Sequence, residues 1–380
     1  MPPTVRVNRK AAARITSGHP WIFLSDVVDK GEAQPGDIVK VVDDRNRPLC
    51  QAHYSSTSQI TLRRLPDPLD WHAVLTAAMK FRERYVSGTE AWRLVHAEGD
   101  FLPALIIDRY ADCFTLQALD QGMDRATPEI VQALVDLFHP KGIIARNDAA
   151  VRTQENLPRE VKVLHGEIPA EIPIRMNGFV FHADLQHGQK TGIFLDQREN
   201  YVAAARYARG RALDCFTSSG GFALHISAQC EQVEGVDSSE RALEAARRNQ
   251  AANGIGNVQF READVFDLLS GQSADKRYDT VVLDPPAFAK SRKQLDRALG
   301  AYKEINLRAL KALNSGGILV SCSCSHHVSE AELLGVVAQA ALDARRTLRV
   351  LERRTHSQDH PILLTVPETH YLKCLIFECL

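Results

Sequence analysis

Apolar and polar positions alternate in a regular order along the second half of the chain, from about residue 185 onward. Short apolar runs, each the length of a buried strand, occur at residues 211–216, 233–237, 278–283 and 318–322. Amphipathic stretches between them predict helices that start at Phe222, span 240–252 before Gly254, and span about 301–313 before Gly316 and Gly317. Strands that alternate with helices indicate a parallel sheet with helices on both faces, a Rossmann-like α/β fold.

The first half of the chain has two other patterns. Residues 1–68 contain short β-type runs such as 37–42 and 59–62, separated by Gly, Pro and Asp, and end in a Pro-containing linker at 65–68. A predicted helix over 71–85 follows, and then further strands, including 104–107 and 179–181. We therefore predict three domains: a β-rich module (1–68), an α+β middle domain (69–184) and a C-terminal Rossmann-like domain (185–380).

Composition narrows the functional classes. The 380 residues carry a net charge of −1, which excludes a grossly basic protein, although the first 65 residues hold roughly ten Lys and Arg against about six acids. Eight cysteines without regular spacing do not indicate a disulfide framework. The N-terminal residues lack the apolar core of a signal peptide, and no apolar run reaches the ~18 residues of a membrane span. We expect a cytoplasmic protein with no membrane partner.

Acidic residues follow the predicted strands of the C-terminal domain. Ligands of open parallel sheets bind beyond the carboxyl ends of the strands, where Asp214, Asp237, Asp264 and Asp284 are predicted to lie. A carboxylate at Asp237 suits a ribose diol, but the turn at 217–221 lacks the GxGxxG pattern that binds a pyrophosphate. A nucleoside with a sulfonium side chain fits better. The alternative is that each Asp only caps a helix.

The strand at 278–283 ends in Asp284-Pro285-Pro286. Two prolines end the ladder of strand hydrogen bonds and fix a rigid turn, so that Asp284 is placed to hydrogen-bond a planar base. An ordinary turn is the alternative.

Two cysteines, Cys322 and Cys324, end the next predicted strand and precede two histidines. Their CxC spacing matches structural zinc sites poorly, so we predict no metal. Cys322 is expected in the core, because free cysteine is among the most buried residue types. Cys324 lies nearer the strand end and is a candidate nucleophile for an electron-poor ring.

Four motifs together resemble one known family. They are GHPWIF at 18–23, PGDIV at 35–39, RND at 146–148 with Arg152, and GQKTGIFLDQR at 188–198. With the strand-end residues, they make the chain resemble, nearly end to end, the PUA-containing class I methyltransferases related to bacterial large-subunit rRNA (cytosine-C5) methyltransferase I.

The resemblance implies an N-terminal PUA domain that binds RNA and a C-terminal methyltransferase domain that binds S-adenosyl-L-methionine. It implies large-subunit rRNA as the substrate and a homodimer as the assembly. It assigns Cys324 the attack on C6 of cytosine, and Asp284 the contact with the target base. The cofactor-binding residues it implies are Lys190, Thr191 and Phe194 in the segment that closes over the cofactor, Asp214, Phe216 and Gly220 in the loop, Asp237 at the ribose, and Asp264 near adenine, together with Asp284.

Three other functions are compatible with parts of the pattern. A methyltransferase that acts on an exocyclic amine would need no nucleophilic cysteine, and commonly has Asn-Pro-Pro where this chain has Asp284-Pro285-Pro286. A non-catalytic RNA-binding protein would not need the full set of strand-end acids. A nicotinamide oxidoreductase is disfavoured because GxGxxG is missing.

Overall fold

The structure is a computed structural model that describes residues 2–188, 191–270, 277–289 and 291–380. By their contacts these residues divide into two compact units, each described separately below. Unit 1 consists of Met1–Ile174, Ala183–Ile193 and Gln358–Thr369, and unit 2 of Arg175–His182, Phe194–Ser357 and His370–Leu380. The division into three domains stays a prediction.

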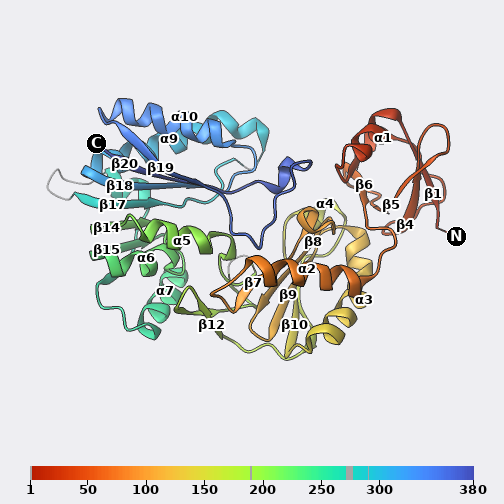
Figure 1. The fold of residues 1–380 in the computed structure, drawn as a ribbon, viewed down its shortest axis with the longest axis horizontal. Coiled ribbons are helices and arrows are strands. Elements are labelled where there is room, and N and C mark those ends of the chain that lie inside the picture. The colour runs from red at the N-terminus through yellow and green to blue at the C-terminus, as the bar shows by residue number, and fades with distance from the viewer. Residues whose placement is uncertain (1, 189–190, 271–276, 290) are drawn as a thin grey trace. The chain divides into compact units, whose positions relative to one another are not determined.

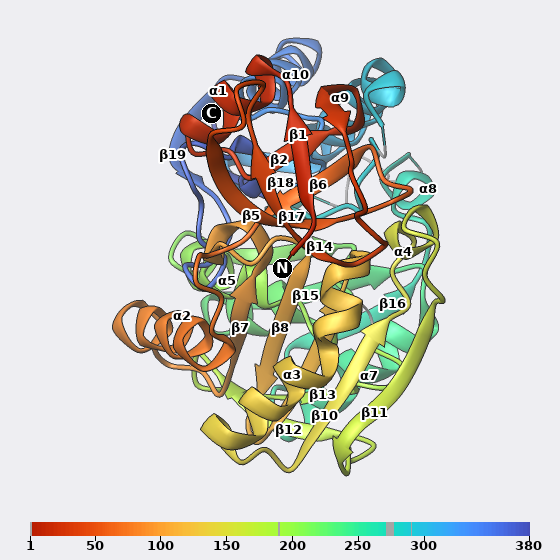
Figure 2. The same ribbon diagram turned by 90° about the vertical axis from the view of Figure 1, so that its right-hand side faces the viewer.

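Unit 1 begins with a six-stranded sheet whose strand order is β2-β6-β5-β4-β1-β3 (Figure 2). Its strands are β1 Thr4–Val7, β2 Trp21–Phe23, β3 Val27–Asp29, β4 Ile38–Val42, β5 Pro48–Tyr54 and β6 Ile60–Arg64. Alternation along β4 buries Val39 and Val41 in a core that α1 (Arg9–Thr16) also joins through Ala11 and Ile15. The predicted β-rich character of this region is confirmed.

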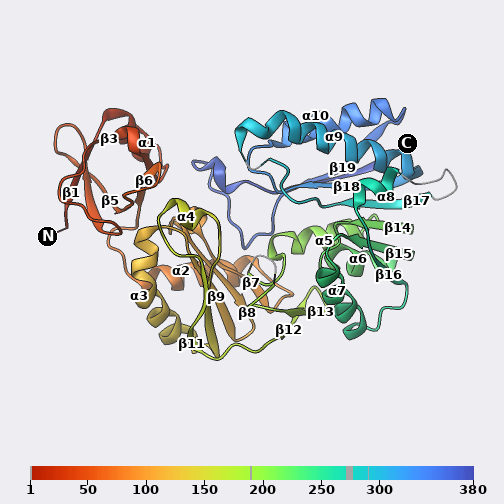
Figure 3. The same ribbon diagram turned by 180° about the vertical axis from the view of Figure 1, so that it is seen from behind.

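A second sheet of unit 1 has the strand order β11-β10-β9-β8-β7 (Figure 3). Its strands are β7 Ala91–His96, β8 Leu105–Tyr110, β9 Cys113–Ala118, β10 Gly142–Asn147 and β11 Glu160–Gly166. Two helices, α2 (Trp71–Tyr85) and α3 (Gln121–Phe138), pack their apolar sides into one core with this sheet, and a short helix α4 (Val151–Gln154) follows β10. The predicted helix over 71–85 is confirmed, with the Asp70 side chain accepting a hydrogen bond from the Ala73 amide at its start.

Unit 2 is built on a seven-stranded sheet with the order β16-β15-β14-β17-β18-β20-β19. The strands are β14 Gly210–Cys215, β15 Cys230–Asp237, β16 Val258–Glu262, β17 Tyr278–Leu283, β18 Leu313–Ser323, β19 Leu348–Arg354 and β20 Lys373–Cys379. All neighbours are parallel except for the pairs that β20 makes with β18 and β19. The strand order reverses between β14 and β17, and at such a switch point an open sheet binds its ligand.

Helices cover both faces of this sheet, as predicted (Figure 1). The helices of one face are α5 Arg198–Ala205, α6 Gly221–Ile226 and α7 Glu240–Ala252. Those of the other face are α8 Val265–Ser270, α9 Leu295–Ala312 and α10 Glu330–Asp343, and Figure 3 labels α8. The second group shares one apolar core with the sheet. A two-stranded sheet of β12 (Ile172–Met176) and β13 (Phe179–Ala183) precedes these elements. Within the described ranges, no helix is both long and apolar enough to cross a lipid bilayer.

One predicted boundary is wrong. Gly316 and Gly317 were expected to end the helix before β18, but α9 already ends at Ala312 and both glycines lie inside the strand. Gly316 has a φ of +78°, which suits glycine, at a point where the pairing with β17 shifts its register. These glycines therefore shape a β-bulge rather than a helix end.

Candidate active site at the strand ends of unit 2

The turn after β14 carries an unusual backbone. Phe216, Ser218 and Gly220 have φ angles of +62°, +50° and +84°, in the left-handed region that non-glycine residues rarely adopt. The Asp214 carboxylate stabilises this turn: its Oδ2 accepts hydrogen bonds from Thr217 Oγ1 at 2.6 Å and from the Ala223 amide at 2.9 Å. The turn is thus fixed from both ends at the switch point of the sheet.

Asp214 is 1% exposed, and its second oxygen, Oδ1, is buried and has no hydrogen-bond partner among the described residues. Burial raises the pKa of Asp214 to about 7; the bonds from Thr217 and Ala223 oppose this rise, whereas the nearby carboxylates of Asp284 and Asp237 add to it. An unpaired buried acceptor surrounded by further acids is suited to a cationic ligand.

Asp237, at the end of β15, joins two strand ends. Its Oδ2 accepts from the Ser218 amide at 3.0 Å, and its Oδ1 accepts from the Ser239 amide at 2.9 Å. Asp264, after β16, accepts from the Asp267 amide at 3.1 Å and so caps α8. The helix-cap alternative therefore describes one role of Asp264, and its contact with adenine stays a prediction.

The two predicted catalytic residues lie at neighbouring strand ends. Cys324, directly after β18, is half-buried, and its Sγ lies 3.9 Å from the carbonyl oxygen of Pro285, which follows Asp284. Gln197 donates from Nε2 to Asp284 Oδ1 at 2.9 Å and so orients this carboxylate. Unit 2 thus brings the thiol and the Asp-Pro-Pro turn into contact.

A buried hydroxyl network holds the loop that bears Cys324. Ser323 Oγ donates to the Tyr302 hydroxyl at 2.9 Å, the Tyr302 hydroxyl lies 3.1 Å from Ser325 Oγ, and all three residues are buried. Sequence reasoning missed both Tyr302 and Gln197. No local motif marks Tyr302, and Gln197 lies in the motif at 188–198 without any sign there that it contacts Asp284.

Cys322 and Cys324 have opposite environments, as expected. Cys322 is 0% exposed and faces Cys374 on β20, and burial raises its pKa well above the ordinary value. It belongs to the core and is not available as a thiolate. Among the described residues, no group of three or more His, Cys, Asp or Glu is arranged to hold a metal ion.

The remaining predicted cofactor residues are placed as follows. Lys190 lies outside the described residues. Thr191 belongs to unit 1, where it is buried and its hydroxyl donates to Asp108 and lies 3.1 Å from the Tyr110 hydroxyl. Phe194 belongs to unit 2, where Tyr201 donates to its carbonyl at 3.5 Å. Unit 2 therefore gathers the strand-end residues, and the cofactor roles of Lys190, Thr191 and Phe194 stay predictions.

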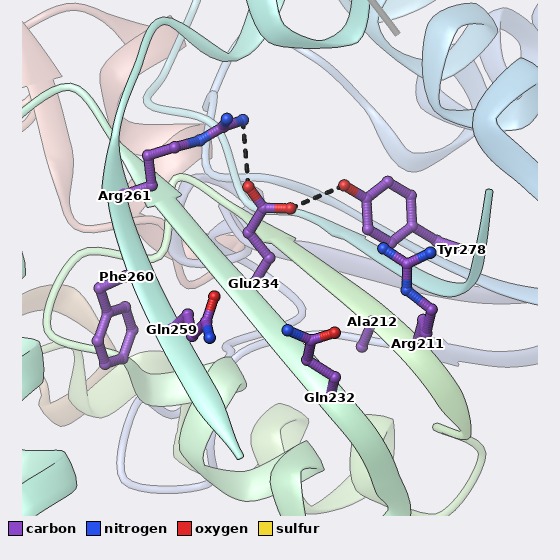
Figure 4. Close-up of a pocket in the computed structure, with 8 residues that line it drawn as sticks. All are labelled: Arg211, Ala212, Gln232, Glu234, Gln259, Phe260, Arg261 and Tyr278. Atoms are coloured by element: carbon purple, nitrogen blue, oxygen red, sulfur yellow. Dashed lines mark hydrogen bonds and ion pairs between the residues drawn. The ribbon is translucent and has the colours of Figure 1, made fainter. Parts of the chain in front are cut away.

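A separate hollow of about 450 Å³ lies on the same sheet, lined mostly by the first halves of β14, β15 and β17 and by β16 (Figure 4). At its centre, Glu234 accepts from the Tyr278 hydroxyl at 2.9 Å and pairs with Arg261 at 3.1 Å. Glu234 and Arg261 thus already form an ion pair, and none of the predicted site residues lines the hollow. The predicted site at the strand ends is therefore separate from this hollow.

Two known protein families match different parts of the chain. A PUA-like domain matches residues 5–66, and a methyltransferase domain matches residues 208–360. The ribosomal RNA large subunit methyltransferase I of Tolumonas auensis is 38% identical over 100% of both chains. The proteins of the same name from Shewanella denitrificans and Klebsiella pneumoniae are 39% and 37% identical over 94% and 93% of both chains.

Solved structures show the same fold at lower sequence identity. A protein of Streptococcus mutans assigned as a SAM-dependent methyltransferase superimposes with a TM-score of 0.83 at 19% identity, covering 99% of this chain and 100% of its own. A methyltransferase solved in complex with SAH gives a TM-score of 0.84 with the same identity and coverage. The predicted fold, cofactor class and enzyme class are confirmed: the protein is a SAM-dependent methyltransferase of the ribosomal RNA large subunit methyltransferase I family.

Proposed function

We propose that the protein methylates C5 of a cytosine in large-subunit ribosomal RNA, and that Cys324 forms a transient covalent bond with C6 of that base. The observation that carries the proposal is the contact between Cys324 Sγ and the Asp284-Pro285 turn, 3.9 Å from the Pro285 carbonyl. A half-buried thiol beside a turn that holds a carboxylate is suited to attack a base bound by that carboxylate.

The acids around β14 and β15 support binding of the methyl donor. S-adenosylmethionine supplies a methyl group on a positively charged sulfur. The buried unpaired Oδ1 of Asp214 and the carboxylate of Asp237 fit such a ligand, because a cation compensates the cost of clustering three acids. Asp237 would hold the ribose hydroxyls, and Phe216 and Gly220 would shape the loop.

Unit 2 supplies the groups for the attack on C6 and for holding the target base. The Cys324 thiolate adds to C6, and the electron pair of the C5–C6 double bond becomes available at C5. C5 takes the methyl group as the carbon–sulfur bond of the donor breaks and leaves a neutral thioether. A base removes the C5 proton, and the electron pair restores the double bond as the thiolate departs. Asp284, held by Gln197, would keep the pyrimidine edge in place throughout.

The N-terminal sheet supports an RNA substrate. It matches a PUA-like domain, and roughly ten Lys and Arg against about six acids in the first 65 residues favour binding of phosphates. The names of the relatives specify large-subunit ribosomal RNA. We infer a cytoplasmic location, where that RNA is found, and a homodimer, which sedimentation at several protein concentrations would test.

The test uses purified protein, methyl-labelled S-adenosylmethionine and bacterial large-subunit RNA without its own modifications. The RNA is digested to nucleosides and the label is located by chromatography. Three variants run in parallel: Cys324→Ala removes the nucleophile, Asp284→Asn removes the carboxylate, and Cys50→Ser is the matched control, a half-buried cysteine of the N-terminal sheet.

We expect label in 5-methylcytidine from the native protein and from Cys50→Ser, and none from Cys324→Ala. Label in another nucleoside that survives Cys324→Ala would replace the covalent mechanism with transfer to an amine. Cofactor binding without any label in RNA would contradict the assigned substrate.

A further inference from the structure

A buried lysine lies beneath the loop that carries Cys324. Lys373 is the first residue of β20, and the antiparallel pairing with β18 places it directly opposite Ser323. Its side chain is 2% exposed, and its Nζ donates to the carbonyl oxygens of Ser325 and Tyr371, each at 2.8 Å. The ammonium is therefore fixed against the backbone one residue after the thiol.

The charge of Lys373 has no carboxylate partner in direct contact within the described part of unit 2. Its two bonds go to neutral carbonyls, and none of the ion pairs described there includes it. A buried ammonium without an anion is costly, so an anion nearby is favoured. Burial lowers the pKa of Lys373 to about 8, and among the nearby charges that raise it Cys324 acts more strongly than Glu332 or Glu330.

Two titratable groups near this thiol, Tyr302 and His370, are displaced toward their neutral forms. Tyr302 on α9 keeps its proton, because burial, its largest influence, raises its pKa, and the charge of Cys324 does the same. Burial and Lys373 both lower the pKa of His370. Among the described residues, the titratable groups that contact Lys373 or that interact electrostatically with Lys373 or Cys324 include Tyr302 on α9, Glu330 and Glu332 on α10, and His370 and Tyr371 before β20. Asp284 precedes Pro285, whose carbonyl lies near Cys324 Sγ, and the His326 ring lies against that of Tyr371.

We propose that Lys373 is a positioning residue that holds Cys324 as a thiolate at neutral pH. The proposal rests on the proposed role of Cys324 as the nucleophile. Lys373 would act through the thiol: its ammonium would stabilise the negative sulfur before it attacks the base and again after it departs. No proton leaves Lys373 in these steps, and the bond that forms and breaks is the one between sulfur and C6.

A positive charge near the thiol explains why a lysine can hold Cys324 in its thiolate form. A thiolate is the reactive form of cysteine, and a cation within 4–6 Å typically lowers the pKa of an acidic group by about 1–3. Because Nζ is held by two carbonyls, it stays in place when the sulfur becomes neutral in the covalent intermediate. The ammonium would be protonated over the range below its own pKa of about 8, which includes neutral pH.

The test measures the ionisation of Cys324 directly and needs neither RNA nor methyl transfer. The full-length protein is treated briefly with iodoacetamide from pH 5.5 to 9.5, and modification of the Cys324 peptide is followed by mass spectrometry. The variants are Lys373→Met, which removes the charge at similar size, Lys373→Arg, which restores it, and Tyr302→Phe, which loosens the same loop but keeps the ammonium.

We expect the native midpoint to lie below the ordinary thiol pKa of about 8.5. In Lys373→Met the midpoint of the pH profile should rise by about one pH unit, so that alkylation at pH 7 becomes about tenfold slower. Lys373→Arg should restore the native profile, and Tyr302→Phe should leave the midpoint unchanged. A purely tethering role for Lys373 would instead give Lys373→Met and Tyr302→Phe the same profile, and that result would overturn the proposal.

A native midpoint at or above 8.5 would also overturn the proposal, whether or not the variants fold. Failure of the proposed function would look different. Cys324→Ala would then still methylate RNA, while the alkylation profiles of the native protein and of Lys373→Met would keep their separation.

Discussion

Replacing Asp214 with asparagine should remove a pH dependence that the native unit 2 carries. The carboxyl is 1% exposed, and burial raises its pKa from 3.8 to about 7. Because the folded-state pKa is the higher one, the folded form retains a proton that the unfolded chain loses above about pH 4. Stability from this group is therefore full below pH 4 and is lost progressively as the pH rises to about 7. The loss amounts to about 4 kcal/mol over that range, or about 1.4 kcal/mol per pH unit.

The hydrogen bonds of Asp214 make asparagine a clean comparison. Oδ2 accepts both bonds, from Thr217 and Ala223, so the amide oxygen of asparagine can take its place. The amide nitrogen then occupies the position of the unpaired Oδ1 and costs about 1–3 kcal/mol at every pH. A difference in stability at a single pH therefore does not test the elevated pKa of Asp214. The test is how the stability of the native protein and of the variant changes with pH.

Hydrogen exchange of peptides from β14 and β17 would measure this slope. Native protein and Asp214→Asn are compared at each pH, so that the intrinsic pH dependence of exchange cancels. From pH 5 to 7 the opening free energy of the native protein should fall relative to the variant by about 1.4 kcal/mol per pH unit, and the difference should level off above pH 7. If the opening free energy of the native protein minus that of the variant stays constant or rises with pH, the elevated pKa of Asp214 is refuted.

Three further expectations can be measured directly. Asp237→Asn removes a charge and leaves one oxygen for the amides of Ser218 and Ser239, so calorimetry should show S-adenosylmethionine affinity about tenfold weaker or more; an unchanged affinity would argue against the ribose assignment. Gly221→Ala would place its Cβ 2.4 Å from the Tyr201 ring, so unit 2 should lose about 1–3 kcal/mol of stability, and an unaltered melting temperature would contradict this packing. RNA affinity should fall steeply with added salt, and a flat response in filter binding would exclude phosphate contacts as its main source.

The chemistry of the strand ends could be predicted from sequence because it follows from local patterns. A run such as 278–283 marks a buried strand, and the residue after a parallel strand lies at the ligand-binding edge whatever the details of packing. Asp214, Asp237 and Asp284 were located in this way. In the structure Asp214 and Asp237 both accept hydrogen bonds from the turn at 217–218, and the Asp284 amide donates to the carbonyl of Cys215, which follows Asp214. Their contacts with the cofactor stay predictions.

The supporting residues could not be predicted, because they depend on pairings between distant segments. Tyr302 reaches the Cys324 loop from the middle of α9, and Gln197 reaches Asp284 from before α5. Lys373 arrives through the register of β20 against β18, and neither strand specifies that register by itself. The same limit explains the error at Gly316, where a glycine serves a bulge between strands rather than the end of a helix.

The reversed direction of β20 also explains how one edge of the sheet can carry both a group of acids and a buried lysine. The carboxyl ends of β14, β15 and β17 gather Asp214, Asp237 and Asp284, which favour a cationic methyl donor. A parallel strand beside β18 would bring another carboxyl end to the same edge. Because β20 runs antiparallel, it brings its first residue instead, and that residue is Lys373. The sheet therefore gathers acids at the switch point and places a buried lysine beside the end of β18, where its ammonium contacts the Ser325 carbonyl next to Cys324. A thiolate and a sulfonium can then be stabilised at one edge, each by a fixed charge of opposite sign.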